Sequence, residues 1–507
     1  MVALSGGKKW KFGILSGLLA KTVSAVLMAA ILASCGDGYK GYSYTVSGTV
    51  SGLVGSGLVL QNNAGDDLIV PINGTFSFST AIHNGSPYSV TIKTMPGSLP
   101  QTCTVVNGNG TINNTPVGNV TVNCLVVPPR LVVDPTGNFV YASNYKSNNI
   151  SAFTINATTG ALTLVPGSPF AAGTNPNSFT VDPLGKFAYI ANFNSSNVSA
   201  YTINAGTGVL TPVAGVPFAA GTNPFAATII PSTAILSGQY AYVANVNANN
   251  ISAYAINAVT GALTTVPGSP FAAGTNPYTV TIDPTGNFAY AANISSSTIS
   301  VYVIDQTTGA LTAGTAVDTG VNPGTVTIDP SGEFAYVANT GSATISVYTI
   351  DQTTGALTAV SLSLVGTGTD PRSLIIDPTG YFAYVANYTS NTISVYTIDQ
   401  TTGALTAGTA VAAGTNPSAI TIDPSGRFAY AINYSSNNIS AYKIETTGDL
   451  TPITGSPFAA GTNPYAVTID PTGMFAYALN AGSNNISVYI IDQITGALTA
   501  GTAVPIP

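Results

Sequence analysis

Residues 322–339 read NPGTVTIDPSGEFAYVAN, and this stretch decides the fold. Two runs rich in β-branched and aromatic residues flank the tetrapeptide Asp329-Pro330-Ser331-Gly332. Such runs favour strands, and in the tetrapeptide Pro fixes one φ angle while Gly accepts a positive one. The stretch therefore predicts a β-hairpin.

The second strand of this hairpin alternates large and small side chains. Phe334 and Tyr336 fall on one face of the strand, and Ala335 and Val337 fall on the other. Large aromatic side chains on one sheet and small ones on the next allow twisted sheets to pack as blades.

Working outward, the same unit recurs along the chain. Each hairpin is followed by a run such as Ile-Ser-Val-Tyr and then by Thr-Gly-Ala-Leu-Thr, which gives four strand signals, A to D. The Asp of the A–B turn recurs every 46 to 48 residues in the intact units, at Asp134, Asp182, Asp283, Asp329, Asp377, Asp423 and Asp470. A degenerate unit, GQYAYVAN at 238–245, makes eight. We therefore predict an all-β fold with a β-propeller of eight four-stranded blades, seven being the alternative.

The repeat resembles the YVTN family, which belongs to the lactonase-like β-propeller superfamily. Tyr336-Val337-Ala338-Asn339 and Tyr384-Val385-Ala386-Asn387, with the Asp-Pro-x-Gly turns before them, carry this resemblance over about residues 125–507. Family members usually have seven blades. The resemblance implies a possible activity, that of a lactonase-like hydrolase resembling phosphogluconolactonase.

The first residues form a processing signal. Four lysines precede an apolar stretch from Thr22 to Ala33, which is too short to span a bilayer. The stretch ends in Leu32-Ala33-Ser34-Cys35-Gly36, which resembles a bacterial lipobox with Cys35 as the lipidated residue. We predict a signal peptide at 1–34, an anchor and linker at 35–43, and attachment to the outer membrane, on its periplasmic or cell-surface face.

The short β-rich runs of residues 44–125 predict a separate small β-sandwich, similar to immunoglobulin-like modules. The propeller is predicted to follow at 126–507. Its two cysteines, Cys103 and Cys124, are expected to form a disulfide in an oxidising compartment. The one histidine, His83, stands alone, so we expect no metal site and no other cofactor.

Charge narrows the classes of partner. Without the signal peptide, eight basic residues face nineteen acidic ones, a net charge of about −11. Nucleic acid requires a basic surface, so it is excluded as a partner. We expect the protein to be a monomer. Its expected partners are the membrane, through the lipid anchor, and a glycan or envelope protein.

The propeller sequence lacks the usual groups for hydrolysis. It contains no histidine and no Gly-x-Ser-x-Gly motif. Most of its acids recur at the same turn in most units, as expected for structural residues. We therefore predict no catalytic residue and leave enzymatic activity open, with a binding or interaction protein as the main hypothesis and a structural surface protein as a further alternative.

A binding site is predicted where the repeat varies. The D–A loops carry Asn-Pro in most units, and the residue after this Pro differs from unit to unit. We predict that the variable side chains form an aromatic and polar rim at the channel mouth, suited to sugars or extended peptides. The predicted binding residues are Phe225, Tyr278, Asp370, Arg372 and Tyr465.

Overall fold

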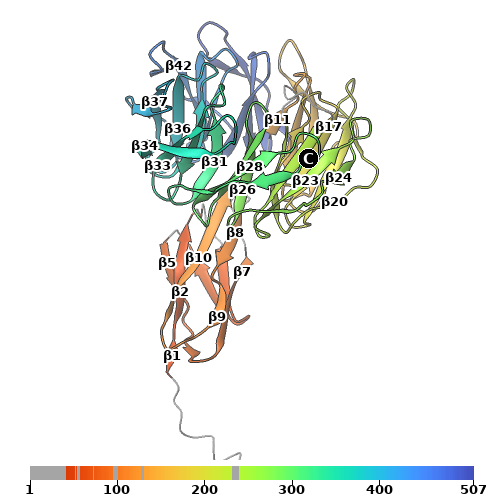
Figure 1. Cartoon of the computed structure of the whole chain (residues 1–507). Coiled ribbons are helices and arrows are strands. Elements are labelled where there is room, and N and C mark those ends of the chain that lie inside the picture. The colour runs from red at the N-terminus through yellow and green to blue at the C-terminus, as the bar shows by residue number, and fades with distance from the viewer. Residues whose placement is uncertain are drawn as a thin grey trace, which may run out of the picture.

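The computed structural model describes residues 42–51, 53, 58–71, 74–94, 101–126, 131–230 and 239–507. The predicted signal peptide and Cys35 lie outside this part of the chain. Two bodies are visible, a narrow N-terminal domain and a broad ring of sheets above it (Figure 1). All the regular elements in the described residues are strands.

The N-terminal domain contains two four-stranded sheets around one hydrophobic core. The sheet orders are β5-β2-β10-β8 and β4-β3-β7-β9, and β1 pairs with β6. The strands are β1 (Ser43–Tyr44), β2 (Val46–Ser51), β3 (Leu58–Asn62), β4 (Asp66–Val70), β5 (Gly74–Ser77), β6 (Ile82–His83), β7 (Pro87–Thr94), β8 (Gln101–Val106), β9 (Asn109–Thr111) and β10 (Val117–Val126). Cys103 and Cys124 lie opposite each other on β8 and β10 and form the predicted disulfide.

The rest of the described chain forms eight sheets, each built from one continuous segment in the order A-B-C-D. The A strands are β11 (Leu131–Val133), β16 (Thr180–Val181), β21 (Pro224–Ile229), β26 (Pro277–Ile282), β31 (Pro323–Ile328), β35 (Pro371–Ile376), β40 (Pro417–Ile422) and β45 (Pro464–Ile469). The B strands are β12 (Phe139–Asn144), β17 (Phe187–Asn192), β22 (Gln239–Asn245), β27 (Phe288–Asn293), β32 (Phe334–Asn339), β36 (Phe382–Asn387), β41 (Phe428–Asn433) and β46 (Phe475–Asn480).

The C and D strands complete each blade on its outer side. The C strands are β13 (Asn149–Ile155), β18 (Asn197–Ile203), β23 (Asn250–Ile256), β28 (Thr298–Ile304), β33 (Thr344–Ile350), β37 (Thr392–Ile398), β42 (Asn438–Ile444) and β47 (Asn485–Ile491). The D strands begin at β14 (Leu162–Leu164), β19 (Leu210–Pro212), β24 (Leu263–Thr265), β29 (Leu311–Ala313), β34 (Leu357–Gly366), β38 (Leu405–Ala407), β43 (Leu450–Pro452) and β48 (Leu498–Ala500).

In seven blades a second short segment also pairs with the C strand. These segments are β15 (Phe170–Ala171), β20 (Phe218–Ala219), β25 (Phe271–Ala272), β30 (Val317–Asp318), β39 (Val411–Ala412), β44 (Phe458–Ala459) and β49 (Val504–Pro505). The prediction of a propeller with eight four-stranded blades is thus confirmed.

The alternation read from the B strand sets how blades pack. Phe334 and Tyr336 belong to a core shared with the next blade, where Ala383 and Val385 face them. Ala335 and Val337 belong to the core shared with the preceding blade. The large rings of one blade therefore pack against the small residues of the next.

Candidate functional site at the inner rim of the propeller

The A strands form the inner wall of the ring, because neighbouring blades meet through them. β10 ends at Val126 and β11 begins at Leu131, so the chain enters the ring on the side where the A strands start. This is the side of the D–A loops. It faces the N-terminal domain, and the A–B turns lie on the opposite side (Figure 1).

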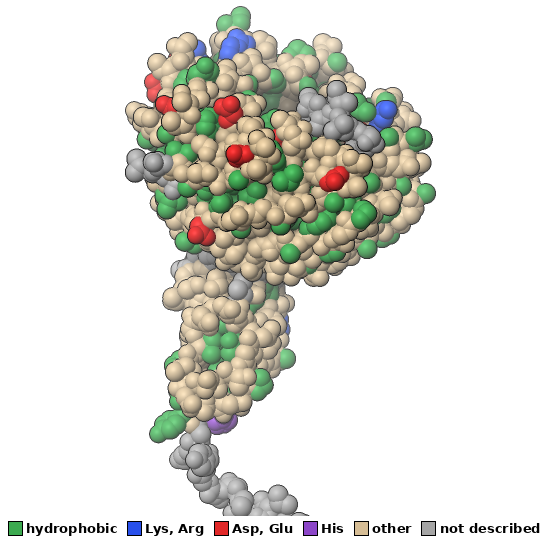
Figure 2. Space-filling model, in the orientation of Figure 1, with side chains coloured by type: hydrophobic (Ala, Val, Ile, Leu, Met, Phe, Trp, Pro, Cys, Tyr) green, Lys and Arg blue, Asp and Glu red, His purple; other side chains and the backbone are tan. Residues whose placement is uncertain are grey.

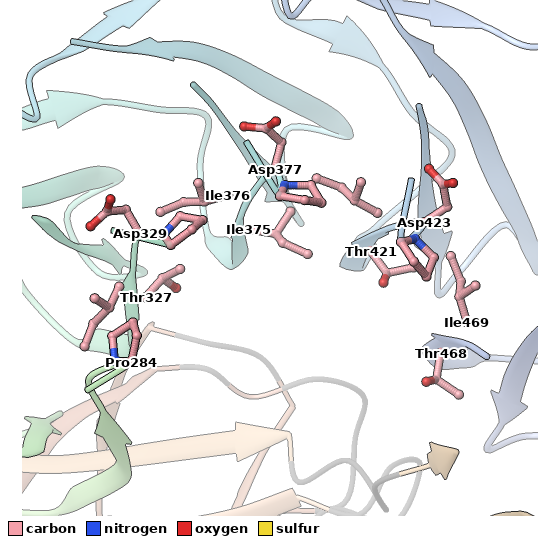
Figure 3. Close-up of a pocket in the computed structure, with 15 residues that line it drawn as sticks. Pro284, Thr327, Asp329, Ile375, Ile376, Asp377, Thr421, Asp423, Thr468 and Ile469 are labelled. Atoms are coloured by element: carbon pink, nitrogen blue, oxygen red, sulfur yellow. The ribbon is translucent and has the colours of Figure 1, made fainter. Parts of the chain in front are cut away.

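A pocket of about 400 Å³ opens between the A–B ends of the A strands of blades 4 to 8. Side chains such as Thr327, Ile375, Thr421 and Thr468 line it. The carboxylates of its aspartates point away from the space (Figure 3). The pocket wall is therefore neutral and largely apolar.

The carboxylate of each A–B aspartate accepts hydrogen bonds within its own turn. The Asp329 carboxylate accepts from the backbone N–H of Phe334 at 2.8 Å and of Ser331 at 3.0 Å, and also from the Ser331 hydroxyl. All seven of these aspartates are buried. Their predicted structural role is confirmed by these contacts.

The C–D aspartates also serve their turns. The Asp399 carboxylate accepts from the backbone N–H groups of Thr401 and Thr402 at 2.9 and 2.8 Å. These hydrogen bonds, the one from Thr402 first, lower the pKa of Asp399. The remaining charges on the visible surface are few and scattered (Figure 2).

The D–A rim is built on a repeated asparagine. The residue before the Pro of each D–A loop has a positive φ of 51° to 58° in blades 2 to 8. In five of these blades its side-chain amide donates to a backbone carbonyl of the preceding blade, as Asn276 Nδ2 does to Val246 O at 2.9 Å. The other asparagines that make this link are Asn175, Asn223, Asn416 and Asn463.

Blade 6 departs from this pattern, because Asp370 occupies the asparagine position with the same backbone conformation, φ 58°. An ionised carboxylate cannot donate the inter-blade hydrogen bond. Asp370 instead accepts from Arg372, from Nη2 at 2.8 Å and from Nε at 3.1 and 3.2 Å. The pair is the least exposed of the three ion pairs found among the described residues, with side chains 25% and 16% exposed.

Arg372 also stacks on a tyrosine. Its guanidinium carbon lies 3.4 Å from the centre of the Tyr388 ring. Tyr388, Tyr434 and Tyr465 belong to one buried cluster at this part of the rim. Burial raises the pKa of Tyr434 to about 12, with the nearby Tyr388 contributing, and also raises the pKa of Tyr388.

The predicted binding residues thus form two clusters and not one continuous rim. Phe225 packs on Tyr278 in blades 3 and 4, with ring centres 4.0 Å apart. Asp370 and Arg372 lie with the tyrosines of blades 6 to 8. Phe225 and Tyr465 are each only 4% exposed, because they pack within their clusters.

Sequence reasoning missed Tyr388 and Tyr434. Both directly follow the Asn that ends a B strand. This position varies between units as the D–A position does, since it holds Val246 and Ile294 elsewhere. The same search for variable positions would have found them.

The described residues include no group of three or more His, Cys, Asp and Glu side chains placed to hold a metal ion. Over the same part of the chain, no helix is long and apolar enough to cross a membrane.

Eight four-stranded sheets around a central channel define the protein as a β-propeller. The model of the family described as lactonase, seven-bladed β-propeller, matches residues 111–223, 222–323, 314–417 and 407–507. The chain belongs to this lactonase family. It has one blade more than the family description states.

Solved structures share the fold. A putative 6-phosphogluconolactonase from Bacteroides fragilis is 22% identical, with a TM-score of 0.51 over 73% of this chain and 96% of its own. The periplasmic gluconolactonase of Pseudomonas aeruginosa is 17% identical, with a TM-score of 0.50 over 73% and 95%. Sqt1 of Saccharomyces cerevisiae is 12% identical, with a TM-score of 0.55 over 74% and 95%. No curated protein matches the chain.

Proposed function

We propose that the rim cluster of Asp370, Arg372, Tyr388 and Tyr434 binds a sugar-like ring, and that lactones are the ligand class. The observation that supports this most is the Asp370–Arg372 pair, which replaces the structural asparagine of the other D–A loops. We propose lactones as the ligand class because the chain belongs to the lactonase family.

Arg372 supplies donors for such a ligand. Its Nε and Nη2 bond to Asp370, and the Nη1 end takes no part in this pair. Guanidinium N–H groups bond well to carbonyl and hydroxyl oxygens. Stacking on the Tyr388 ring holds the guanidinium in place, which reduces the entropy lost on binding.

Hydrolysis of the bound lactone is the second candidate function. The family to which the chain belongs supports this candidate. In such a reaction Asp370 would take a proton from water, the hydroxide oxygen would add to the lactone carbonyl, and Arg372 would stabilise the oxyanion. Collapse would break the ring C–O bond, and the ring oxygen would receive the proton. The ion pair limits this reaction, because the Asp370 carboxylate oxygens already accept hydrogen bonds from Arg372.

The proposed location is the cell envelope. It is supported by the basic and apolar start of the chain and by the lipobox-like residues that end in Cys35. The N-terminal domain would then hold the propeller away from the membrane, with a glycan or an envelope protein as the macromolecular source of the ligand. Incorporation of labelled palmitate into wild type but not into Cys35→Ser tests the anchor.

Calorimetric titration with glucono-δ-lactone tests the binding proposal, using the full-length chain in detergent. We expect saturable binding that is lost in Arg372→Gln and kept in Arg427→Gln, whose side chain lies on the A–B side. A pH-stat run in parallel measures acid release above buffer. Release that depends on Asp370 and Arg372 would establish the hydrolase. Absence of binding in wild type would overturn both candidates at this site.

A further inference from the structure

We propose that Asp370 is a specificity-determining residue that keeps anionic ligands away from Arg372. The inference rests on the proposed function in one respect, because it assumes that Arg372 contacts the ligand. It names the ligand class more closely: neutral rings are accepted, and phosphorylated sugars and ring-opened acids are rejected.

The fold does not require an acid at position 370. Asparagine occupies the equivalent position in six other blades at nearly the same φ. In five of them its amide links two blades, a bond that Asp370 cannot make. The acid therefore loses an inter-blade hydrogen bond. Its carboxylate gains the ion pair with Arg372 and also accepts a long hydrogen bond from the Thr389 hydroxyl at 3.5 Å.

The charge of the pair explains the selectivity. Alone, an arginine over an aromatic ring is a general site for phosphate and carboxylate. With Asp370 at 2.8 Å the site is neutral overall. An incoming phosphate would lie beside a carboxylate that is only a quarter exposed, where water screens the repulsion incompletely.

Among the described residues of the propeller, the other cations lie away from Arg372. Lys186 is in the A–B turn of blade 2. Lys146 is on the same side but in blade 1, three blades away around the ring. Arg427 lies in an A–B turn, where it donates to Gln493 O at 2.8 Å. Lys443 pairs with Glu445 on the C strand. A neutral lactone meets no such barrier, and the same repulsion would favour release of the acid formed if the ring opens.

Asp370→Asn tests the proposal, because it restores the residue of the other blades and can re-form the inter-blade bond. The probe is inorganic phosphate, titrated by calorimetry into the full-length chain. We expect no saturation in wild type, and a gain in affinity of about tenfold or more in Asp370→Asn, as expected for removal of a nearby like charge. The gain should vanish in Asp370→Asn/Arg372→Gln.

Asp370→Gly is the second variant, since glycine also accepts the positive φ. It keeps the test informative if the asparagine variant fails to fold. Phosphate binding to wild type as tight as to both variants would overturn the proposal, and so would absence of binding to both folded variants. Neither result depends on the lactone titration, so failure of this proposal and failure of the proposed function remain distinguishable.

Discussion

The Tyr477 hydroxyl donates to the backbone carbonyl of Gly160 at 3.1 Å, across 317 residues of sequence. It joins the last blade to the first. The same bond occurs at each of the other seven interfaces, from the B-strand tyrosine of one blade to the C–D turn glycine of the next. No strand is shared between the first and last described blades, so this bond and side-chain packing close the ring.

Tyr477→Phe should therefore weaken closure of the ring at its seam, the interface between the last and first described blades. Loss of the hydroxyl leaves a buried carbonyl without a donor and should cost about 1–2 kcal/mol of unfolding free energy. Tyr290→Phe, at an interior interface, is the matched control and should cost a similar amount in chemical denaturation. Only Tyr477→Phe should also speed proteolysis of the first and last blades, because only there does local opening release chain ends. Equal proteolysis in the two variants would contradict a special role for the seam.

Asp329→Ala should destabilise the propeller by about 2–3 kcal/mol, since charged acceptors contribute more than neutral ones. The loss follows from the hydrogen bonds that the Asp329 carboxylate accepts from the N–H groups of the buried Phe334 and of Ser331. The shift of the denaturation midpoint measures it. The neighbouring exposed Glu333→Gln is the control and should change the midpoint little. A similar small shift in Asp329→Ala would show that the turn holds without its carboxylate.

Asn276→Ala should cost about 1–3 kcal/mol, from the lost bond to Val246 O and from the positive φ that alanine resists. Asn276→Gly should cost less. Glycine also lacks the hydrogen bond to Val246 O, but it adopts the positive φ without strain. Thermal melting of the two variants measures the difference. If Asn276→Gly melts at the same temperature as Asn276→Ala, the positive φ contributes little to the loss of stability.

The stability of the propeller should fall as pH rises above about 10, the ordinary pKa of tyrosine. Burial first, and then the charges of Asp329 and Asp399, raise the pKa of Tyr336, and burial raises the pKa of Tyr442 to about 12. The folded protein therefore holds protons that the unfolded chain releases, so unfolding becomes easier as pH increases. Denaturation midpoints between pH 8 and pH 11 measure the loss, together with tyrosinate absorbance. Ionisation of most tyrosines before unfolding would contradict it.

The local parts of the fold were predictable because each depends on neighbours in sequence. Asp329 and Gly332 lie within one turn, and the turn geometry follows from these residue types. Phe334 and Tyr336 share a face because the strand period is two. Eight repetitions of the same signals made the blade number readable even though one unit is degenerate.

For the candidate site, the sequence predicted some of the residues but not how they contact one another. A variable position in a regular repeat identified Asp370 and Arg372, but nothing in the sequence spacing pairs Arg372 with the Tyr388 ring or separates it from Tyr278. Those partners come from different loops, and their directions depend on how each loop packs.

The sequence by itself determined the all-β class, the eight blades and the structural role of the turn aspartates, since these follow from residue types and periodicity over short distances. Only the tertiary structure decided that Tyr477 meets Gly160, that Phe225 and Tyr465 are buried in separate clusters, and that Asp370 neutralises Arg372. The physical reason is that these contacts join residues on different blades or in irregular loops, where position is fixed by the packing of the whole ring and no local propensity encodes it.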